Sequence, residues 1–304
     1  MKEITYTFRS ITNCNMCGSD SSQHHILGKR LNQPQGKRPG SKIGISTTIM
    51  KCNVCQLIFA NPQPIPQNIQ DHYGIPPENY WNDENVSFQN PAYFVNEINV
   101  LKKLMTIEKG AKALDIGAGL GKAMLALEKV GFDVFGFEAS ESFYKKTLEK
   151  KDIDPKKLKL GMIENLDYPK NEFDFITFSA VLEHLYSPSE SVEKAISWLK
   201  PGGIIHIEIP SSDWLIGKFI NLFYKLSLTD YVGNISPMHP PFHLYEFSLK
   251  SFEMHAKKNN YEIIFQEYYV CETYMPKAIN FFIAPYMKWT NKGMQLCVWL
   301  KKNK

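Results

Sequence analysis

The sequence predicts an α/β protein with a mostly parallel sheet covered by helices on both faces, preceded by a small metal-binding module. From about residue 91, strand-like and helix-like segments alternate regularly, which is typical of parallel sheets with helical crossovers. Before residue 60, four cysteines form two CxxC pairs, a spacing typical of a small metal-binding fold.

The strand-like segments are short apolar or alternating runs bounded by turn residues. They lie at residues 111–117, 132–138, 158–164, 173–181, 202–210, 261–270 and 293–302. Helices are expected at residues 93–108, 122–130, 141–150, 187–200 and 248–258. The run at 173–181 is almost continuously apolar, as expected for a strand that is covered on both faces. We therefore expect a sheet whose strands are joined by helices.

Composition divides the chain into three regions. Residues 1–60 contain the paired cysteines and a basic middle, and they are expected to form a separate module. Residues 61–90 are rich in Pro, Asn and Gln, which is typical of a linker with few regular elements. Residues 91–304 contain the alternating pattern and are expected to form the main domain.

Charge and apolar content narrow the class of protein. The net charge of +4 is smaller than a dedicated nucleic-acid-binding protein usually carries, which disfavours nucleic acid as a partner. The N-terminus lacks the continuous apolar run of a secretory signal peptide. The most apolar segments, Ile216–Leu226 and Ala278–Met287, are too short to span a bilayer. Because the six cysteines do not form a disulfide-like pattern, we expect a cytoplasmic protein without a transmembrane segment.

A glycine-rich turn follows the first predicted strand of the main domain. Between this strand and a helix, the sequence DIGAGLG contains Asp115, Gly117, Gly119 and Gly121. Glycines allow a sharp turn and let a ligand approach the backbone amides, and the helix N-terminus attracts negative charge. Glu138 ends the second strand, where a carboxylate can accept hydrogen bonds from both hydroxyls of a ribose. The turn therefore predicts a site for a nucleoside-containing cofactor.

Two classes of cofactor use such a turn, and the residue spacing separates them. Dinucleotide-binding loops have the pattern GxGxxG, whereas here the third glycine comes one residue early and Lys122 follows it. Asp115 would also lie beside the phosphates of a dinucleotide. A cationic sulfonium with an amino-acid tail suits this acid better, because Asp115 can orient the ammonium group. An NAD-dependent enzyme is therefore disfavoured.

Further motifs follow in a fixed order along the main domain. They are FGFE at 135–138, NEFDFITFSAVLEHLYSP at 171–188 and SWLKPGGIIHIEIP at 197–210. Together with DIGAGLG, they resemble the class I S-adenosylmethionine-dependent methyltransferases over residues 91–304. The resemblance implies a Rossmann-like sheet of seven strands, mostly parallel, with an antiparallel last strand and helices on both faces. It also implies S-adenosyl-L-methionine as the cofactor.

The resemblance also implies roles for individual residues. Residues expected around the methionine part of the cofactor are Asp115, Gly117, Gly119 and Gly121. Glu138 is expected to bind the ribose. Residues expected near the adenine or beneath the cofactor are Ala139, Met162, Ile163, Phe178 and Ser179. Many relatives have an acidic residue in place of Met162 that contacts the adenine amine, so here this contact has to come from a backbone group or be missing.

The N-terminal region resembles the zinc-ribbon leader of methyltransferases from sugar and natural-product biosynthesis. The run CNVCQLIF at 52–59 and the run NPQP at 61–64 carry this resemblance. Such proteins often have tyrosines after the ribbon, and Tyr73 and Tyr80 are accordingly expected on the substrate or cofactor side. The best-studied sugar C-methyltransferases of this kind have a further C-terminal domain, for which this chain is too short. This disfavours methylation of carbon.

The cysteine pairs predict a structural zinc site. The pattern CxxC-x34-CxxC is formed by Cys14, Cys17, Cys52 and Cys55. Each pair can direct two thiolates to one tetrahedral ion, and four thiolates leave no open coordination position. Redox activity is the alternative, and His24 and His25 are alternative ligands. The basic stretch between the pairs, which includes Lys29, Arg30, Lys37, Arg38 and Lys42, predicts a solvated loop, with contact to a polyanion as the alternative.

Histidines after the fourth and fifth strands are candidates for a catalytic base. Methyl transfer to a hydroxyl is assisted by removal of its proton, for which histidine is well suited near neutral pH. His184 follows the fourth strand, and His243 lies in a later loop. His239 and Tyr245 are weaker candidates, and His206 is expected to pack within the fifth strand.

The function predicted from the sequence is O-methylation of a small molecule or saccharide. An RNA methyltransferase that binds its substrate through the zinc module and basic loop is one alternative, although no NPPY or DPPY motif follows the fourth strand. A non-catalytic zinc-ribbon interaction protein is another. The apolar stretch 214–226 is expected to form a lid, a dimer face or a peripheral membrane contact, and residues 278–287 have the same alternatives.

Overall fold

The computed structural model describes residues 4–30, 45–77, 93–149, 152–235, 241–271 and 276–303. Contacts divide the chain into two compact units. Unit 1 contains Met1–Gln67, Ala180–Val192 and Ile207–Leu300, and unit 2 contains Asn68–Ser179, Glu193–His206 and Lys301–Lys304. Among the described residues, no helix combines the length and apolarity needed to cross a membrane.

A seven-stranded sheet confirms the predicted α/β class. Its strand order is β13-β14-β10-β9-β6-β7-β8. The strands are β6 (Lys112–Ile116), β7 (Asp133–Glu138), β8 (Leu158–Leu160), β9 (Phe173–Ser179), β10 (Leu199–Pro210), β13 (Tyr261–Tyr269) and β14 (Gln295–Lys302). β6 pairs in parallel with β7 and β9, and β7 pairs in parallel with β8. The last strand of the chain lies between β13 and β10 in this order, whereas its predicted antiparallel direction stays a prediction.

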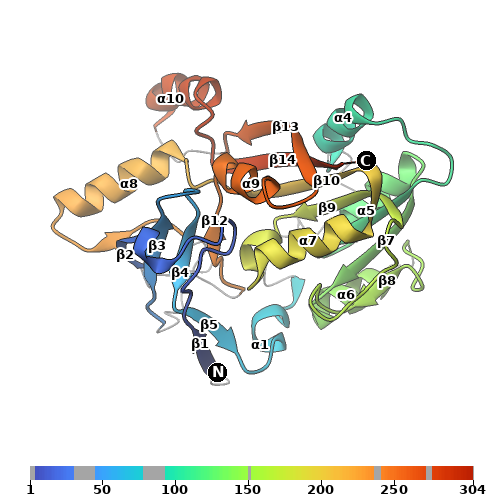
Figure 1. Cartoon of the computed structure of the whole chain (residues 1–304), viewed down its shortest axis with the longest axis horizontal. Coiled ribbons are helices and arrows are strands. Elements are labelled where there is room, and N and C mark those ends of the chain that lie inside the picture. Colours follow the sequence, from blue (N-terminus) through green and yellow to red (C-terminus); the bar gives the residue numbers. More distant parts are fainter. Residues whose placement is uncertain are drawn as a thin grey trace. The chain divides into compact units, whose positions relative to one another are not determined.

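Unit 2 is built on β6 to β9, and buried apolar side chains form its core. The central strands carry Ala113, Leu114, Phe175 and Ile176, all of which are fully buried. Its helices are α1 (Gln70–Tyr73), α4 (Val95–Leu104), α5 (Lys122–Lys129) and α6 (Glu141–Glu149). α5 packs on β6 and β7, and α6 packs on β7 and β8 (Figure 1). Sequential helices therefore cover the strands that precede and follow them, as the alternating pattern predicts. Helix α7 (Pro188–Trp198) agrees with the helix predicted at residues 187–200, and its residues are divided between the two units.

Unit 1 contains a second sheet that the sequence did not predict. Its strand order is β11-β2-β3-β4-β12. The strands are β2 (His24–Arg30), β3 (Thr48–Cys52), β4 (Ile58–Asn61), β11 (Tyr231–Val232) and β12 (Tyr245–Glu246). The pair β1 (Tyr6–Arg9) and β5 (Gln63–Pro66) forms a separate antiparallel ribbon. Short segments from the C-terminal half of the chain thus form both edges of the N-terminal sheet.

The core of this second sheet explains why its strands associate. Ile49, Ile58, Ala60, Val232 and Ile235 form one buried apolar cluster. Gly28 of β2 has no room for a side chain, because an added Cβ would lie 2.5 Å from the Asp230 carbonyl oxygen. This close approach lets β11 pair with β2.

Three helices complete unit 1. They are α8 (Leu215–Leu226), α9 (Leu249–Ala256) and α10 (Lys277–Trp289). α9 begins at a capping box, in which the Ser248 hydroxyl accepts from the Ser251 amide and the Ser251 side chain bonds to the Ser248 amide. This capping places the start of α9 within hydrogen-bonding reach of the second cysteine pair, as described below.

Candidate functional site

The glycine turn between β6 and α5 has the backbone geometry that only glycine adopts readily. Gly119 has a φ of 54° and Gly121 a φ of 73°, both in the left-handed region. The two positions differ in their surroundings. A Cβ on Gly119 would meet no atom closer than 4.0 Å, whereas a Cβ on Gly121 would lie 2.1 Å from Ile153 Cδ1. Gly119 therefore leaves space beside the backbone, and Gly121 permits close packing.

Asp115 is a buried acid at the end of β6. Its side chain is 2% exposed, and its Oδ2 atom has no hydrogen-bond partner. Burial, together with the nearby charge of Glu138, raises the pKa of Asp115 to about 7. An unpaired buried carboxyl oxygen is costly, so this site is suited to a ligand that brings a positive charge or a hydrogen-bond donor.

Glu138 connects the glycine turn to the start of α6. Its Oε2 accepts from the Gly119 amide at 2.7 Å, and its Oε1 accepts from the Ser140 amide at 2.8 Å. Burial raises the pKa of Glu138, and the backbone donors oppose that shift. The carboxylate is thus held in one orientation by the backbone on both sides.

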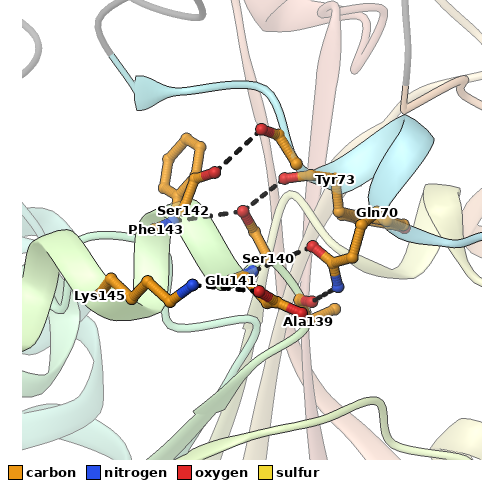
Figure 2. Close-up of polar contacts among 9 residues, drawn as sticks. Gln70, Tyr73, Ala139, Ser140, Glu141, Ser142, Phe143 and Lys145 are labelled. Carbon is orange, nitrogen blue, oxygen red and sulfur yellow. Dashed lines mark hydrogen bonds and ion pairs between the residues drawn. The ribbon is translucent and has the colours of Figure 1, made fainter. Parts of the chain in front are cut away.

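A short helix, α1, is joined to the N-terminus of α6 by side chains (Figure 2). Gln70 Nε2 donates to the Ala139 carbonyl at 2.9 Å, and Gln70 Oε1 accepts from the Glu141 amide at 3.1 Å. The Ser140 hydroxyl donates to the carbonyl of Tyr73. Tyr73 therefore lies in the segment next to the residues that follow Glu138. Tyr80 lies outside the described residues.

The other residues predicted near the cofactor all belong to unit 2. Phe178 is fully buried and Ile163 is 2% exposed, whereas Ala139, Met162 and Ser179 are half-buried. The carbonyl of Met162 accepts from the amides of Asn165 and Leu166, one turn further along the chain. All ten predicted cofactor residues therefore lie in one compact unit, and their contacts with a cofactor stay a prediction.

The four cysteines of the CxxC pairs come together in unit 1. Their sulfur atoms lie within 4.8 Å of one another, and all four residues are buried. Cys14 Sγ lies 3.4 Å from Cys55 Sγ, and Cys17 Sγ lies 3.7 Å from Cys52 Sγ. These separations are near the roughly 3.8 Å expected between thiolates that share a tetrahedral zinc ion. None of the six cysteines forms a disulfide.

Each cysteine pair is shaped by a tight turn. The Gly18 amide donates to the Cys14 carbonyl, and the Gln56 amide donates to the Cys52 carbonyl. Gly18 and Gln56 both have left-handed φ values, of 73° and 68°. The two turns are thus alike in geometry, which brings both sulfurs of each pair to the same side. Within the described residues, the group with metal-ligand geometry includes neither His24 nor His25.

The segment at the start and end of α9 supports the cysteine cluster. The hydroxyls of Ser248 and Ser251 both donate to the Cys55 carbonyl, at 2.8 and 3.1 Å. Lys258 Nζ donates to the carbonyl of Cys17. Both turns are therefore held by α9 and the residues that flank it, which come 193 to 241 residues later in the chain.

His184, His243 and Glu183 form a second cluster in unit 1. Their ligand atoms lie within 4.8 Å of one another, and the two histidine rings meet edge to face with centroids 4.7 Å apart. His243 Nε2 lies 3.9 Å from Glu183 Oε1. Sequence reasoning predicted both histidines but missed Glu183, for which the adjacent acid in the run Leu182-Glu183-His184 was the available signal.

Burial and hydrogen bonds determine the protonation of Glu183 and His184. Glu183 is 2% exposed, its Oε2 has no hydrogen-bond partner, and burial raises its pKa to about 8. His184 Nδ1 lies 3.1 Å from the Phe242 carbonyl oxygen. Because a carbonyl can only accept, Nδ1 carries a proton, and a neutral His184 ring then has its lone pair on Nε2.

The weaker candidates have structural partners. His206 is fully buried, its Nδ1 lies 2.9 Å from the Thr177 hydroxyl, and burial lowers its pKa to about 3. The Tyr245 hydroxyl donates to the Tyr186 carbonyl at 3.1 Å, and burial raises its pKa. The predicted packing role of His206 agrees with these contacts. His239 lies outside the described residues.

The described part of the basic stretch is already engaged. Lys29 forms an ion pair with Asp230 at 2.6 Å. Arg30 is 2% exposed, and its guanidinium lies over the Phe242 ring at 4.8 Å from the centroid. Neither side chain is thus presented as a free surface charge. Lys37, Arg38 and Lys42 lie outside the described residues.

Comparison with known proteins identifies the class to which this fold and glycine turn belong. Residues 93–266 match the family described as "Methyltransferase domain". The chain belongs to this family, and it has the fold and the cofactor-turn motif of the class I S-adenosylmethionine-dependent methyltransferases. The family and fold predicted from the sequence are therefore confirmed.

Individual relatives match about half of the chain. An uncharacterized protein of Methanocaldococcus jannaschii is 34% identical over 154 residues, which cover 50% of this chain and 65% of the relative. Ubiquinone biosynthesis O-methyltransferase of Coxiella burnetii is 26% identical and is matched over 67% of its length and 53% of this chain. Demethylmenaquinone methyltransferase of a Geobacillus species is 30% identical over 40% of this chain and 54% of its own length. The chain thus spans about two thirds or less of these relatives.

Among solved structures, the complex between the Haloferax volcanii Trm112 methyltransferase activator and a methyltransferase matches with a TM-score of 0.53. The match covers 78% of this chain and 98% of that chain at 13% sequence identity. At this identity the likeness shows the fold alone.

Proposed function

We propose that this chain transfers a methyl group from S-adenosylmethionine to a hydroxyl oxygen of a small molecule or saccharide. The observation that carries the proposal is the cluster of His184, His243 and buried Glu183, which joins two proton-accepting rings to a carboxyl group. Methylation of a hydroxyl is assisted by such a base, because the acceptor oxygen must lose its proton. A relative named ubiquinone biosynthesis O-methyltransferase supports oxygen as the acceptor atom.

The residues of unit 2 fit the proposed cofactor. Asp115 has an unpartnered buried oxygen that suits the positively charged ammonium or sulfonium of S-adenosylmethionine. At Gly119 an added Cβ would have its nearest neighbours at 4.0 Å, so the methionine part can approach the backbone there. Glu138 already accepts from two amides, and its remaining lone pairs can accept from ribose hydroxyls. Met162 and Ile163 provide an apolar side for the adenine.

The bound cofactor would supply an electrophilic methyl group on sulfur. In the proposed reaction, His184 removes the proton of the acceptor hydroxyl through its Nε2 atom. Asp115, Gly119 and Glu138 would hold the cofactor, which would supply its methyl group to the deprotonated oxygen and leave as S-adenosylhomocysteine. The imidazolium that results is stabilised when the neighbouring Glu183 is ionised. His243, whose ring lies 4.7 Å from that of His184 and whose Nε2 lies 3.9 Å from Glu183 Oε1, is the second candidate for the base.

We assign the four-cysteine cluster to a structural zinc ion. Four thiolates complete a tetrahedral shell and leave no position for a substrate. The hydrogen bonds from α9 to both turns support a role in holding the fold together. The boundaries 1–60, 61–90 and 91–304 remain our proposal for the organisation of the chain.

The proposal is tested by incubating the protein with methyl-labelled S-adenosylmethionine and fractionated lysate of its source. We expect the label in small-molecule or saccharide material. His184→Asn should reduce the rate by roughly 100-fold, without changing affinity for S-adenosylhomocysteine, because general-base catalysis contributes about that factor. Glu183→Gln should reduce the rate above about pH 8, where the Glu183 carboxyl group is ionised. As a matched control, His25→Asn changes an exposed histidine of the same unit.

Two results would contradict this function. Nuclease-sensitive label would identify RNA as the acceptor and would make the zinc module and basic stretch its binding elements. Failure to bind S-adenosylhomocysteine would favour the non-catalytic interaction protein. If kcat is unchanged in both cluster variants while label enters the expected fraction, the acceptor does not need a base, and oxygen is the wrong acceptor atom.

A further inference from the structure

Helix α8 has two apolar faces, and only one of them is covered. Ile216 is 4% exposed and lies on the inner face. The residues of the other face follow the spacing i, i+3, i+4 and i+7 along a helix, and they are Phe219, Leu222, Phe223 and Leu226, with exposed fractions of 47%, 50%, 65% and 75%. This spacing places them in one continuous stripe. A regular stripe of large apolar side chains in water indicates a binding surface.

Helix α10 repeats the same arrangement. Met287 is fully buried on its inner face. On the opposite face, large apolar residues recur at helical spacing and are exposed by 46–81%: Ile279, Phe282, Tyr286 and Trp289. Phe281 beside them is 73% exposed. Aromatic residues therefore dominate this second stripe.

Both helices belong to unit 1, and the start of α8 is hydrogen-bonded to the segment that follows α10. The amide of Leu215, the first residue of α8, donates to the carbonyl of Lys292, three residues after α10 ends. Figure 1 shows both helices, with α8 in orange and α10 in red. We name their exposed faces together the aromatic surface, formed by Phe219, Leu222, Phe223, Leu226, Ile279, Phe281, Phe282, Tyr286 and Trp289.

The charged residues of α8 and α10 are all lysines. The exposed side chains Lys218, Lys225, Lys277 and Lys288 lie on α8 and α10, and neither helix contains an acidic residue. Lys218 forms an ion pair with Asp213, at 3.1 Å. The aromatic surface is therefore flanked by positive charge, which is complementary to an anionic surface.

We propose that the aromatic surface binds the headgroup region of an anionic phospholipid membrane. Phe, Trp and Leu side chains would enter the boundary between headgroups and acyl chains, while the lysines contact lipid phosphates. The lysine stems can lie along apolar surface while the ammonium groups remain in water. The protein would then work on an acceptor presented at a membrane surface.

The composition of the aromatic surface favours a membrane over a second copy of the chain as its partner. Protein interfaces are also rich in aromatic residues, but they are depleted in lysine and enriched in arginine, whereas the exposed faces of α8 and α10 carry lysine and no arginine. Two copies joined through this surface would also bring like charges together. An anionic membrane satisfies both the apolar stripe and the lysines.

Vesicle flotation tests the proposal without cofactor or acceptor, so its outcome is separate from that of the methyltransferase assay. One set of vesicles contains phosphatidylcholine alone, and the other contains equal parts of phosphatidylcholine and phosphatidylglycerol. We expect binding to the anionic vesicles that weakens with added salt. The quadruple variant Leu222→Ser, Phe223→Ser, Phe281→Ser, Phe282→Ser should bind at least about 10-fold less. Lys225→Glu with Lys288→Glu should remove the preference for anionic lipid.

The matched control replaces exposed apolar residues elsewhere in unit 1. Phe8 and Ile26 are 54% and 67% exposed, and Phe8→Ser with Ile26→Ser should bind vesicles like the wild type. Melting temperatures show that all variants are folded. The proposal is overturned if the wild type binds neither vesicle, or if the control variant loses binding equally. It is also overturned if light scattering finds a dimer that the quadruple variant converts to a monomer, because the surface is then an interface between copies.

Discussion

Two buried carboxylates lie close together at the carboxyl ends of neighbouring parallel strands, Asp115 on β6 and Glu138 on β7. Glu138 has two backbone donors, whereas Asp115 Oδ2 has none. The free energy of ionising Asp115 is therefore high in the protein without ligand. A cation placed beside it would offset that cost, which links cofactor binding to pH.

We expect the affinity for S-adenosylmethionine to rise between about pH 6 and about pH 8, because Asp115 must lose its proton to attract the cation. Its pKa, raised to about 7 in the folded chain, lies in this window. Asp115→Asn should weaken binding roughly 10-fold and flatten the pH dependence, since it removes a charge-assisted interaction. Calorimetric titrations at several pH values provide the measurement.

The raised pKa of Asp115 also makes the stability of the fold depend on pH. The pKa of Asp115 is 3.8 in the unfolded chain and about 7 in the folded protein. Because the folded protein holds this proton more tightly, the free energy of unfolding decreases as the pH rises between these two values. Asp115→Asn should therefore gain stability relative to the wild type across that range. If the affinity and the melting temperature change with pH in the same way in the wild type and in Asp115→Asn, Asp115 does not have this role.

At the scale of elements, helix α1 has only four residues and depends on the N-terminus of α6 for its position. The α6 N-terminus offers unpaired amides, and the Gln70 side chain occupies one of them while donating to the carbonyl of Ala139. The Ser140 hydroxyl both accepts from the Phe143 amide, at 3.2 Å, and donates to the Tyr73 carbonyl. These contacts hold α1 beside the residue that follows Glu138 (Figure 2).

Gln70→Ala should lower the free energy of unfolding by about 1–2 kcal/mol, because two hydrogen bonds of about 1 kcal/mol each are lost. Hydrogen exchange at the Glu141 amide should accelerate. Gln70→Glu keeps the acceptor for Glu141 and loses the donor to Ala139, so its effect should be intermediate. Gln67→Ala, at an exposed position nearby in sequence, is the control. Equal protection of Glu141 in all variants would show that the side chain does not hold α1.

At the scale of the whole molecule, the N-terminal module is completed by parts of the chain that come much later. β12 pairs with β4, with Tyr245 opposite Phe59, and β11 pairs with β2. α9 donates to the backbone of both cysteine turns. Loss of the metal is therefore expected to disturb unit 1 as a whole, and its effect should extend beyond residues 1–60.

Purified protein should contain about one zinc ion per chain, and chelation should lower the melting temperature by roughly 10 °C, because an ion bound only to the folded state stabilises it by mass action. Cys52→Ser should have the same effect. Cys271→Ser, which changes a half-buried cysteine outside the cluster, should not. A metal-free preparation that melts at the wild-type temperature would rule out the zinc site.

The sequence by itself determined the features that depend on local signals. Alternating segments predicted the order of strands and helices, and most observed bounds agree with them within a few residues. The exceptions have local causes: the strand predicted at 158–164 ends at Leu160, before Gly161 with a φ of 159°, and the helix predicted from residue 93 begins after Phe94 with a left-handed φ of 62°. Glycine spacing and CxxC spacing were equally informative, because each encodes a turn within a few residues.

Only the tertiary structure decided which distant residues meet. Glu183 and His243 form one cluster, Gln70 reaches α6, and Tyr245 extends the sheet of the N-terminal module. It also separated the covered face of α8 from its exposed stripe, which are both apolar in the sequence. The physical reason is that burial and long-range pairing depend on how the whole chain packs, whereas periodicity reports only that a face is apolar and not what covers it.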